Sequence, residues 1–141
     1  MKTLRSIFFL SLCLLLSVAG YAGDKASFLK KQFTARDGYQ LNYRVLYPRD
    51  YNPAQKYPVI LFLHGAGERG SDNEAQLIHG GDMFASFENQ TKYPAIIIAP
   101  QCPAEKTWSE YKGLNAGKEG KRFYPLNAPA TQSMAAVLSL I

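Results

Sequence analysis

The sequence predicts an α/β fold built on a mostly parallel sheet, and two apolar runs carry that prediction. Val59–Leu63 and Ala95–Ala99 consist almost entirely of branched or aromatic side chains and alanine, which is typical of strands that are buried on both faces. The segment between them has short helix-forming stretches, so the two runs predict a parallel βαβ unit. A chain of 141 residues is enough for one domain.

Composition excludes several other classes of protein. With 47% hydrophobic, 13% aromatic and 19% charged residues, the chain is neither disordered nor of low complexity. The formal net charge of +5 includes Lys2 and Arg5 near the N-terminus, and the remaining positive charge is spread along the chain. We therefore expect no nucleic-acid partner. The few histidines and cysteines have no zinc-ligand spacing, so we expect no metal.

The first 22 residues have the order of a secretory signal peptide. Lys2 and Arg5 precede the apolar run Ile7–Val18, and small residues follow up to Ala22. The run is shorter than the roughly 20 residues that a membrane-spanning helix needs. We expect residues 1–22 to be removed on export to the periplasm or the extracellular space. Residues 23–141 would then carry the domain, with no integral membrane span.

The first strands are expected to form a hairpin. Gln32–Ala35 and Gln40–Tyr47 are the two strands, and Asp37-Gly38 between them is a turn signal. Apolar and polar residues largely alternate along the second strand, which predicts a half-exposed strand near a sheet edge. A polar loop, Pro48–Pro58, follows before the first buried run.

The segment between the two buried strands is expected to be helical in short pieces. Ser71 and Glu74 have capping-box spacing, so a short helix should cover Ala75–His79 and end at Gly80-Gly81. His79 would then lie at a helix end, where a positive charge is favourable, rather than act in catalysis. A second short helix is expected to pack through Met83, Phe84 and Phe87.

The C-terminal third begins with an irregular loop, Gln101–Asn127, and continues into a helix that Thr131 begins. The lone cysteine after the leader, Cys102, is interpreted as a small buried apolar residue, with a pairing outside this chain as the alternative. The helix is expected to bury one face formed by Met134, Val137, Leu138 and Ile141. It reaches Ile141 without a cap, so we expect the chain to be the front part of a larger domain.

A glycine-rich loop, His64–Gly70, follows the first buried strand and is the candidate site. Exposed amides in such a loop stabilise a negative oxygen, on a phosphate or on a tetrahedral acyl intermediate. Gly65-x-Gly67-x-x-Gly70 matches the dinucleotide fingerprint, but the helix-capping residues come after the glycines rather than among them. The acyl interpretation is therefore favoured, and a dinucleotide- or phosphate-binding module remains an alternative.

The loop and its surroundings resemble a known family. LFLHGAGERGSDNEAQLIHGG, then KYPAIIIAPQCP and Trp108, are similar to the exported serine esterases of the α/β-hydrolase superfamily, which include carboxylesterases, predicted peptidases and polyhydroxybutyrate-depolymerase-like esterases. The resemblance extends from about Gln32 to the chain end. It implies an incomplete α/β-hydrolase fold, the N-terminal strands and first helices, that ends before the nucleophile elbow. It also implies hydrolysis of a small-molecule or polymer ester without a cofactor, or of a peptide by the same chemistry.

The resemblance assigns one catalytic group to this chain, the backbone N–H of Ala66 as an oxyanion donor, because the family uses the residue after the first loop glycine. The sequence contains no Gly-x-Ser-x-Gly, so the nucleophile, acid and base are expected outside it. The 141 residues alone should be inactive, and a non-catalytic chain is a further alternative. Support of the loop is expected from His64, Gly65, Gly67, Glu68 and Arg69.

Overall fold

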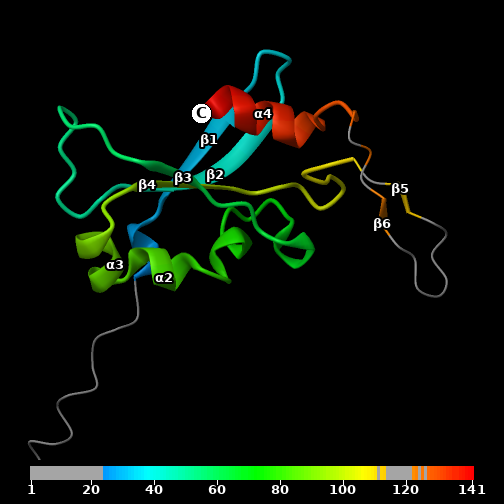
Figure 1. The fold of residues 1–141 in the computed structure, drawn as a ribbon. Coiled ribbons are helices and arrows are strands. Elements are labelled where there is room, and N and C mark those ends of the chain that lie inside the picture. Colours follow the sequence, from blue (N-terminus) through cyan, green and yellow to red (C-terminus); the bar gives the residue numbers. More distant parts are fainter. Residues whose placement is uncertain (1–23, 111, 114–121, 124, 126) are drawn as a thin grey trace, which may run out of the picture.

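The computed structural model describes residues 24–110, 112–113, 122–123, 125 and 127–141, so the expected leader lies outside the described residues. These residues form three layers around a four-stranded sheet (Figure 1). Helix α4 (Gln132–Leu140) covers one face, and the short helices α2 (Gly81–Ala85) and α3 (Phe87–Lys92) lie on the other side. Among the described residues, no helix is both long and apolar enough to cross a membrane.

The sheet is mixed, with the strand order β1-β2-β4-β3. β1 (Leu29–Thr34) pairs antiparallel with β2 (Gln40–Leu46), and β2 pairs antiparallel with β4 (Ile96–Pro100). β3 (Val59–Leu61) pairs in parallel with β4, which confirms the predicted βαβ unit. The prediction of a mostly parallel sheet is wrong for this part of the fold, because the hairpin contributes two antiparallel pairings.

The predicted hairpin is confirmed, although its first strand begins three residues earlier than expected. Ala35 N–H donates to the Tyr39 carbonyl at 2.8 Å, and the Asp37 carboxylate accepts from Tyr39 N–H at 3.0 Å. Gly38 has φ +83°, a conformation that residues other than glycine rarely adopt. Asp37 and Gly38 therefore form the turn that their sequence predicts.

Two predictions about strand exposure are wrong. β2 lies inside the sheet rather than near an edge, and Arg44 on its expected exposed face is buried. β3 was expected to be buried on both faces, but it is an edge strand in which Val59 is 55% and Ile60 is 39% exposed. The guanidinium of Arg44 has hydrogen-bond partners inside the protein. The exposed side chains of β3, in contrast, are not covered by any of the described residues.

The core consists of two clusters of buried residues on opposite faces of the sheet. The cluster on the α2 side contains Phe28, Leu46, Leu77, Ala95, Ile97 and Ala99, with Phe62 and Phe84 packed against it. The cluster under α4 contains Leu41, Ala136 and Val137, with Leu61 and Trp108 among its partly buried neighbours. Burial of apolar side chains against both faces holds the helices to the sheet.

The crossover between β3 and β4 is helical in shorter pieces than predicted. A 3-10 turn, η3 (Ala75–Leu77), replaces the expected five-residue helix, and Asp72 rather than Ser71 accepts from the amides of Glu74 and Ala75. Gly80 has φ +109°, but Gly81 already belongs to α2. Of the aromatic and methionine side chains expected to pack, Phe84 contacts Phe62, whereas Met83 and Phe87 are exposed.

Helix α4 begins as predicted, because the Thr131 hydroxyl accepts from Met134 N–H. Its buried face is rotated by one residue from the expected one, so that Leu138 and Ile141 are exposed. The face turned to the sheet holds Ser133, Ala136 and Val137. Small side chains let a helix approach a sheet closely but contribute little to an apolar pattern. The loop before α4 contains two short paired strands, β5 (Lys112–Gly113) and β6 (Arg122–Phe123).

Candidate functional site

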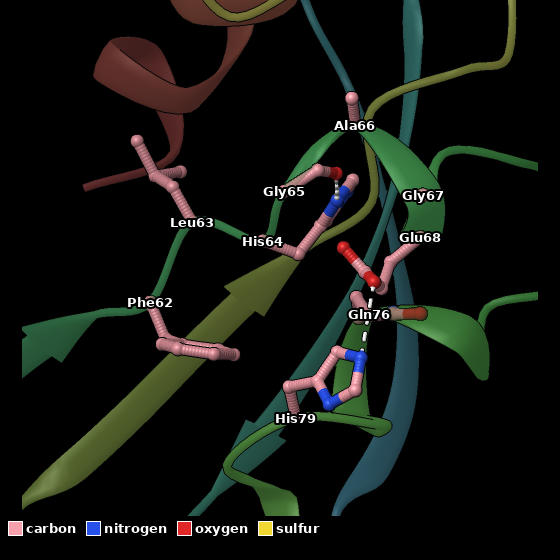
Figure 2. Close-up of a pocket in the computed structure, with 9 residues that line it drawn as sticks. All are labelled: Phe62, Leu63, His64, Gly65, Ala66, Gly67, Glu68, Gln76 and His79. Carbon is pink, nitrogen blue, oxygen red and sulfur yellow. Dashed lines mark hydrogen bonds and ion pairs between the residues drawn. The ribbon is translucent and has the colours of Figure 1, made fainter.

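An open pocket with a volume of about 490 Å³ lies at the carboxyl end of β3 (Figure 2). One wall is apolar, and the other walls present backbone amides and the side chains of a glutamate and a histidine. The glycine loop singled out in the sequence forms most of the lining. The lining residues are Phe62, Leu63, His64, Gly65, Ala66, Gly67, Glu68, Gln76 and His79.

Ala66 is the first residue of a 3-10 turn, η2 (Ala66–Glu68), and it is exposed at the pocket. The preceding Gly65 is extended, with φ −78° and ψ −174°. The first amides of a helical turn have no partner within that turn. In the described part of the chain no hydrogen-bond acceptor is found for Ala66 N–H, so this amide is available to an oxygen atom of a ligand.

His64 is buried, and both nitrogens of its ring are engaged. The backbone N–H of Cys102 donates to His64 Nε2 at 2.9 Å, so Nε2 supplies a lone pair and the ring proton belongs on Nδ1. Nδ1 then donates to the Gly65 carbonyl at 2.6 Å. The Trp108 indole N–H donates to the His64 carbonyl at 3.1 Å. These contacts leave no free nitrogen on His64 to act as a general base.

Arg69 connects two segments around the pocket. Its Nε donates to the Ala66 carbonyl at 2.9 Å, and Nη1 donates to the Lys106 carbonyl at 3.2 Å. Glu68 turns its side chain into the lining, where it is only 14% exposed, and Oε1 lies 3.4 Å from Nε2 of His79. His79 is 79% exposed, and this contact with Glu68 was not predicted from the sequence.

The glycines of the loop differ in what they require. A Cβ at Gly65 would lie 3.1 Å from Glu68 Oε2, and one at Gly70 would lie 3.3 Å from Gln101 Nε2. A Cβ at Gly67 would meet nothing within 4 Å. In dinucleotide-binding folds the helix that follows the glycines holds the pyrophosphate at its N-terminus. Here a three-residue turn follows Gly65 instead of such a helix.

Several polar residues next to the glycine loop were missed from the sequence, of which Arg44 and Gln101 are buried and Asp72 is exposed. The Arg44 guanidinium contacts the Glu74 carboxylate and donates to the Asn73 carbonyl. Hydrogen bonds from the main-chain amides of Ala75 and Glu74, and to a smaller extent from the Gln101 side chain, lower the pKa of Asp72. The available signal was the position of Gln101, a polar residue directly after a buried strand, because strand ends are where side chains converge in α/β folds.

Cys102 is buried, as interpreted from the sequence, and its Sγ lies 3.8 Å from Ser133 Oγ. Burial raises the pKa of its thiol, so it is a poor nucleophile. No group of three histidine, cysteine or acidic residues that could hold a metal ion occurs among the described residues.

The fold is similar to that of a solved structure described as a thermostable esterase. The two share 36% sequence identity with a TM-score of 0.65, over 82% of this chain and 29% of that one. This chain thus corresponds to less than a third of the esterase's length. No family model and no curated protein matches the chain. The described residues therefore have the fold of part of an esterase-like hydrolase.

Proposed function

We propose that this chain supplies the oxyanion loop of an exported serine carboxylic-ester hydrolase. The observation that carries the proposal is that Ala66 is exposed at a pocket and that its amide has no acceptor among the described residues, in a chain similar to part of an esterase. Residues 23–141 form the N-terminal part of the α/β-hydrolase domain in this proposal. The nucleophilic serine, the acid and the histidine base come from polypeptide beyond Ile141.

In the proposed reaction the serine oxygen adds to the ester carbonyl carbon, and the π electrons move onto the carbonyl oxygen. Ala66 N–H donates to that oxygen as its negative charge develops, which lowers the barrier by about 3 kcal/mol. The histidine base takes the proton of the serine hydroxyl during the addition and passes it to the departing alkoxide as the carbonyl re-forms, and water activated by the same base then releases the acid from the serine. The small-molecule or polymer ester would occupy the pocket beside Phe62 and Leu63. A peptide would use the same groups.

Replacement of Ala66 tests the proposal in a protein that includes the polypeptide proposed to lie beyond Ile141. Ala66→Pro removes the N–H at the first position of a turn, after an extended glycine, where proline is tolerated. We expect kcat for p-nitrophenyl acetate to fall about a hundredfold or more, with KM less affected. Ala66→Gly keeps the donor and serves as the control.

Circular dichroism should show that all three proteins fold. A folded Ala66→Pro protein with unchanged kcat would remove Ala66 from the oxyanion hole. A downstream frame without Gly-x-Ser-x-Gly would refute the serine mechanism. If the loop binds a dinucleotide instead, esterase activity should be absent from the wild type, and NAD should raise the melting temperature.

Two further parts of the proposal are tested separately. N-terminal sequencing of the exported protein should begin at or near Gly23, and an intact Met1 would contradict the leader.

The 141-residue chain alone should not hydrolyse p-nitrophenyl acetate above a denatured control, because it has no nucleophile elbow. Turnover abolished by a serine-directed phosphonate would contradict that expectation.

A further inference from the structure

Gln101 directly follows β4 and connects the sheet to the glycine loop. Its backbone N–H donates to the Asn42 carbonyl of β2 at 2.8 Å, which fixes the residue to the sheet. Its side chain is buried and reaches the glycine loop at Glu68 and the segment after the loop at Asp72 and Asn73. Oε1 accepts from Asn73 N–H at 2.7 Å, and Nε2 donates to Asp72 Oδ1 at 2.7 Å and to the Glu68 carbonyl at 3.3 Å.

These partners determine the orientation of the Gln101 amide. A backbone N–H can only donate, so Oε1 must face Asn73. A carboxylate and a carbonyl can only accept, so Nε2 must face Asp72 and Glu68. All three bonds fail if the amide is reversed. A glutamine is therefore matched to this position in length and in the placement of donor and acceptor.

The neighbouring Cys102 holds the same loop through its backbone. Its carbonyl accepts from Gly70 N–H at 2.9 Å, and its N–H donates to the ring of His64. Cys102 thus binds the loop before and after the turn that begins at Ala66, and Gln101 binds the last residue of that turn. Because Glu68 ends that turn, a bond to its carbonyl limits how far the Ala66 amide can rotate.

We propose that Gln101 is a positioning residue that orients the Ala66 amide by anchoring the end of the η2 turn to β4. The inference rests on the proposed function, since it gives the orientation of Ala66 a catalytic purpose. It predicts that the attachment of the loop to β4 weakens when the donor at Gln101 is lost. It also predicts that restoring a donor at the same place restores the loop.

The sharpest variant is Gln101→Glu, which keeps the shape and the acceptor for Asn73. At neutral pH the introduced carboxylate faces Asp72, so the two like charges should separate the loop from β4. Two carboxylates that share a site raise the pKa of one of them. At about pH 5 the introduced carboxyl should therefore be protonated and donate to Asp72 as the amide did.

Amide hydrogen exchange of the 141-residue chain measures the attachment of the loop. The reporter is Gly70 N–H, which binds the Cys102 carbonyl and not the substituted side chain. We expect its protection factor to fall at least about tenfold in Gln101→Glu at pH 7.5 and to recover at pH 5. Gln101→Met has no donor and should lose protection at both pH values.

Two controls isolate the effect. Gln90→Glu makes the same substitution at another buried glutamine, which lies on α3 and whose Nε2 donates to the Phe84 carbonyl of α2. It should leave Gly70 protected at both pH values. The wild type measured over the same range accounts for the other ionisable groups around the loop, which are Asp72, Glu68, His79, Arg69, His64 and Cys102.

The catalytic measurement uses the longer protein of the proposed function. In Gln101→Glu we expect kcat to fall about tenfold or more at pH 7.5 with KM nearly unchanged, and to recover partly relative to wild type at pH 5. Full Gly70 protection in Gln101→Glu at pH 7.5, equal loss in Gln90→Glu, or an unchanged kcat would each overturn the proposal. A wild-type protein without esterase activity would instead refute the proposed function, whatever Gly70 shows.

Discussion

The two edge strands of the sheet expose chemically different side chains to solvent. Exposed polar side chains dominate β1 and include Lys30 and Lys31, whereas β3 contains only Val59, Ile60 and Leu61. Lysines along an edge discourage pairing with another strand. β1 therefore ends the sheet, while β3 has the composition of an interior strand and an apolar surface that lacks a cover among the described residues. The glycine loop that follows β3 is nevertheless held from within the chain, through β4.

The largest effect should come from self-association of the 141-residue chain through β3. Ile60→Lys places charges at the apolar edge and should weaken association by at least about 2 kcal/mol, giving a monomer in size-exclusion chromatography with light scattering. Leu29→Lys makes a similar change at an exposed position of β1 and should have no effect. Association abolished by Leu29→Lys and retained in Ile60→Lys would reverse the comparison of the edges.

Replacing one glycine in each region with alanine should show different losses of stability in the β1 hairpin and in the segment that packs beside β3. Gly80 has φ +109°, and an added Cβ would lie 3.2 Å from the Phe62 ring. Gly38 in the hairpin has φ +83° with nothing within 4 Å. We expect Gly80→Ala to lower the free energy of unfolding by about 2 kcal/mol and Gly38→Ala by about 1 kcal/mol. Urea denaturation measures both, and a smaller loss at Gly80 would contradict the close packing against Phe62.

A smaller effect should appear in the pH dependence of stability. The amides of Ala75 and Glu74, then Gln101, hold the pKa of Asp72 below its ordinary 3.8. A depressed pKa means that the carboxylate stabilises the folded state above pH 3.8, and that this is lost as pH falls through the folded value. Asp72→Asn should therefore lower Tm most near about pH 6, with the difference from wild type shrinking towards about pH 3.

The corresponding carboxylate in the β1–β2 turn provides the comparison. The Tyr39 amide, then the Gln132 side chain, lower the pKa of Asp37, which is exposed. Asp37→Asn should show the same direction of change with a smaller difference in Tm, because fewer donors face it. A Tm difference for Asp72→Asn that grows towards acid pH would contradict the assigned hydrogen bonds.

The smallest effect is expected at the charges of β1. Lys30 and Glu74 form an exposed ion pair, and such pairs contribute at most about 1 kcal/mol. Lys30→Ala should change the free energy of unfolding by less than that, with a loss of solubility as its main consequence. A loss of several kcal/mol would show that β1 depends on this pair for its attachment.

Local signals predicted the parts of the fold that depend on neighbouring residues. Asp37-Gly38 forms the turn, Thr131 caps its helix, and the glycine loop lies beside the pocket. Patterns of exposure were less informative, because they depend on which elements become neighbours. Arg44 looked exposed by alternation yet is buried, since Glu74 and the Asn73 carbonyl lie within reach of its guanidinium.

The sequence by itself determined the hairpin, the parallel pair of strands and the glycine loop that contains Ala66, because turn residues and apolar runs act over a few residues. Tertiary structure alone decided that β2 lies inside the sheet and that Gln101 and Cys102 hold the loop. The buried polar contacts of the site join residues that are far apart in sequence. A buried donor or acceptor is stable only when such a partner is present, and no local pattern identifies that partner.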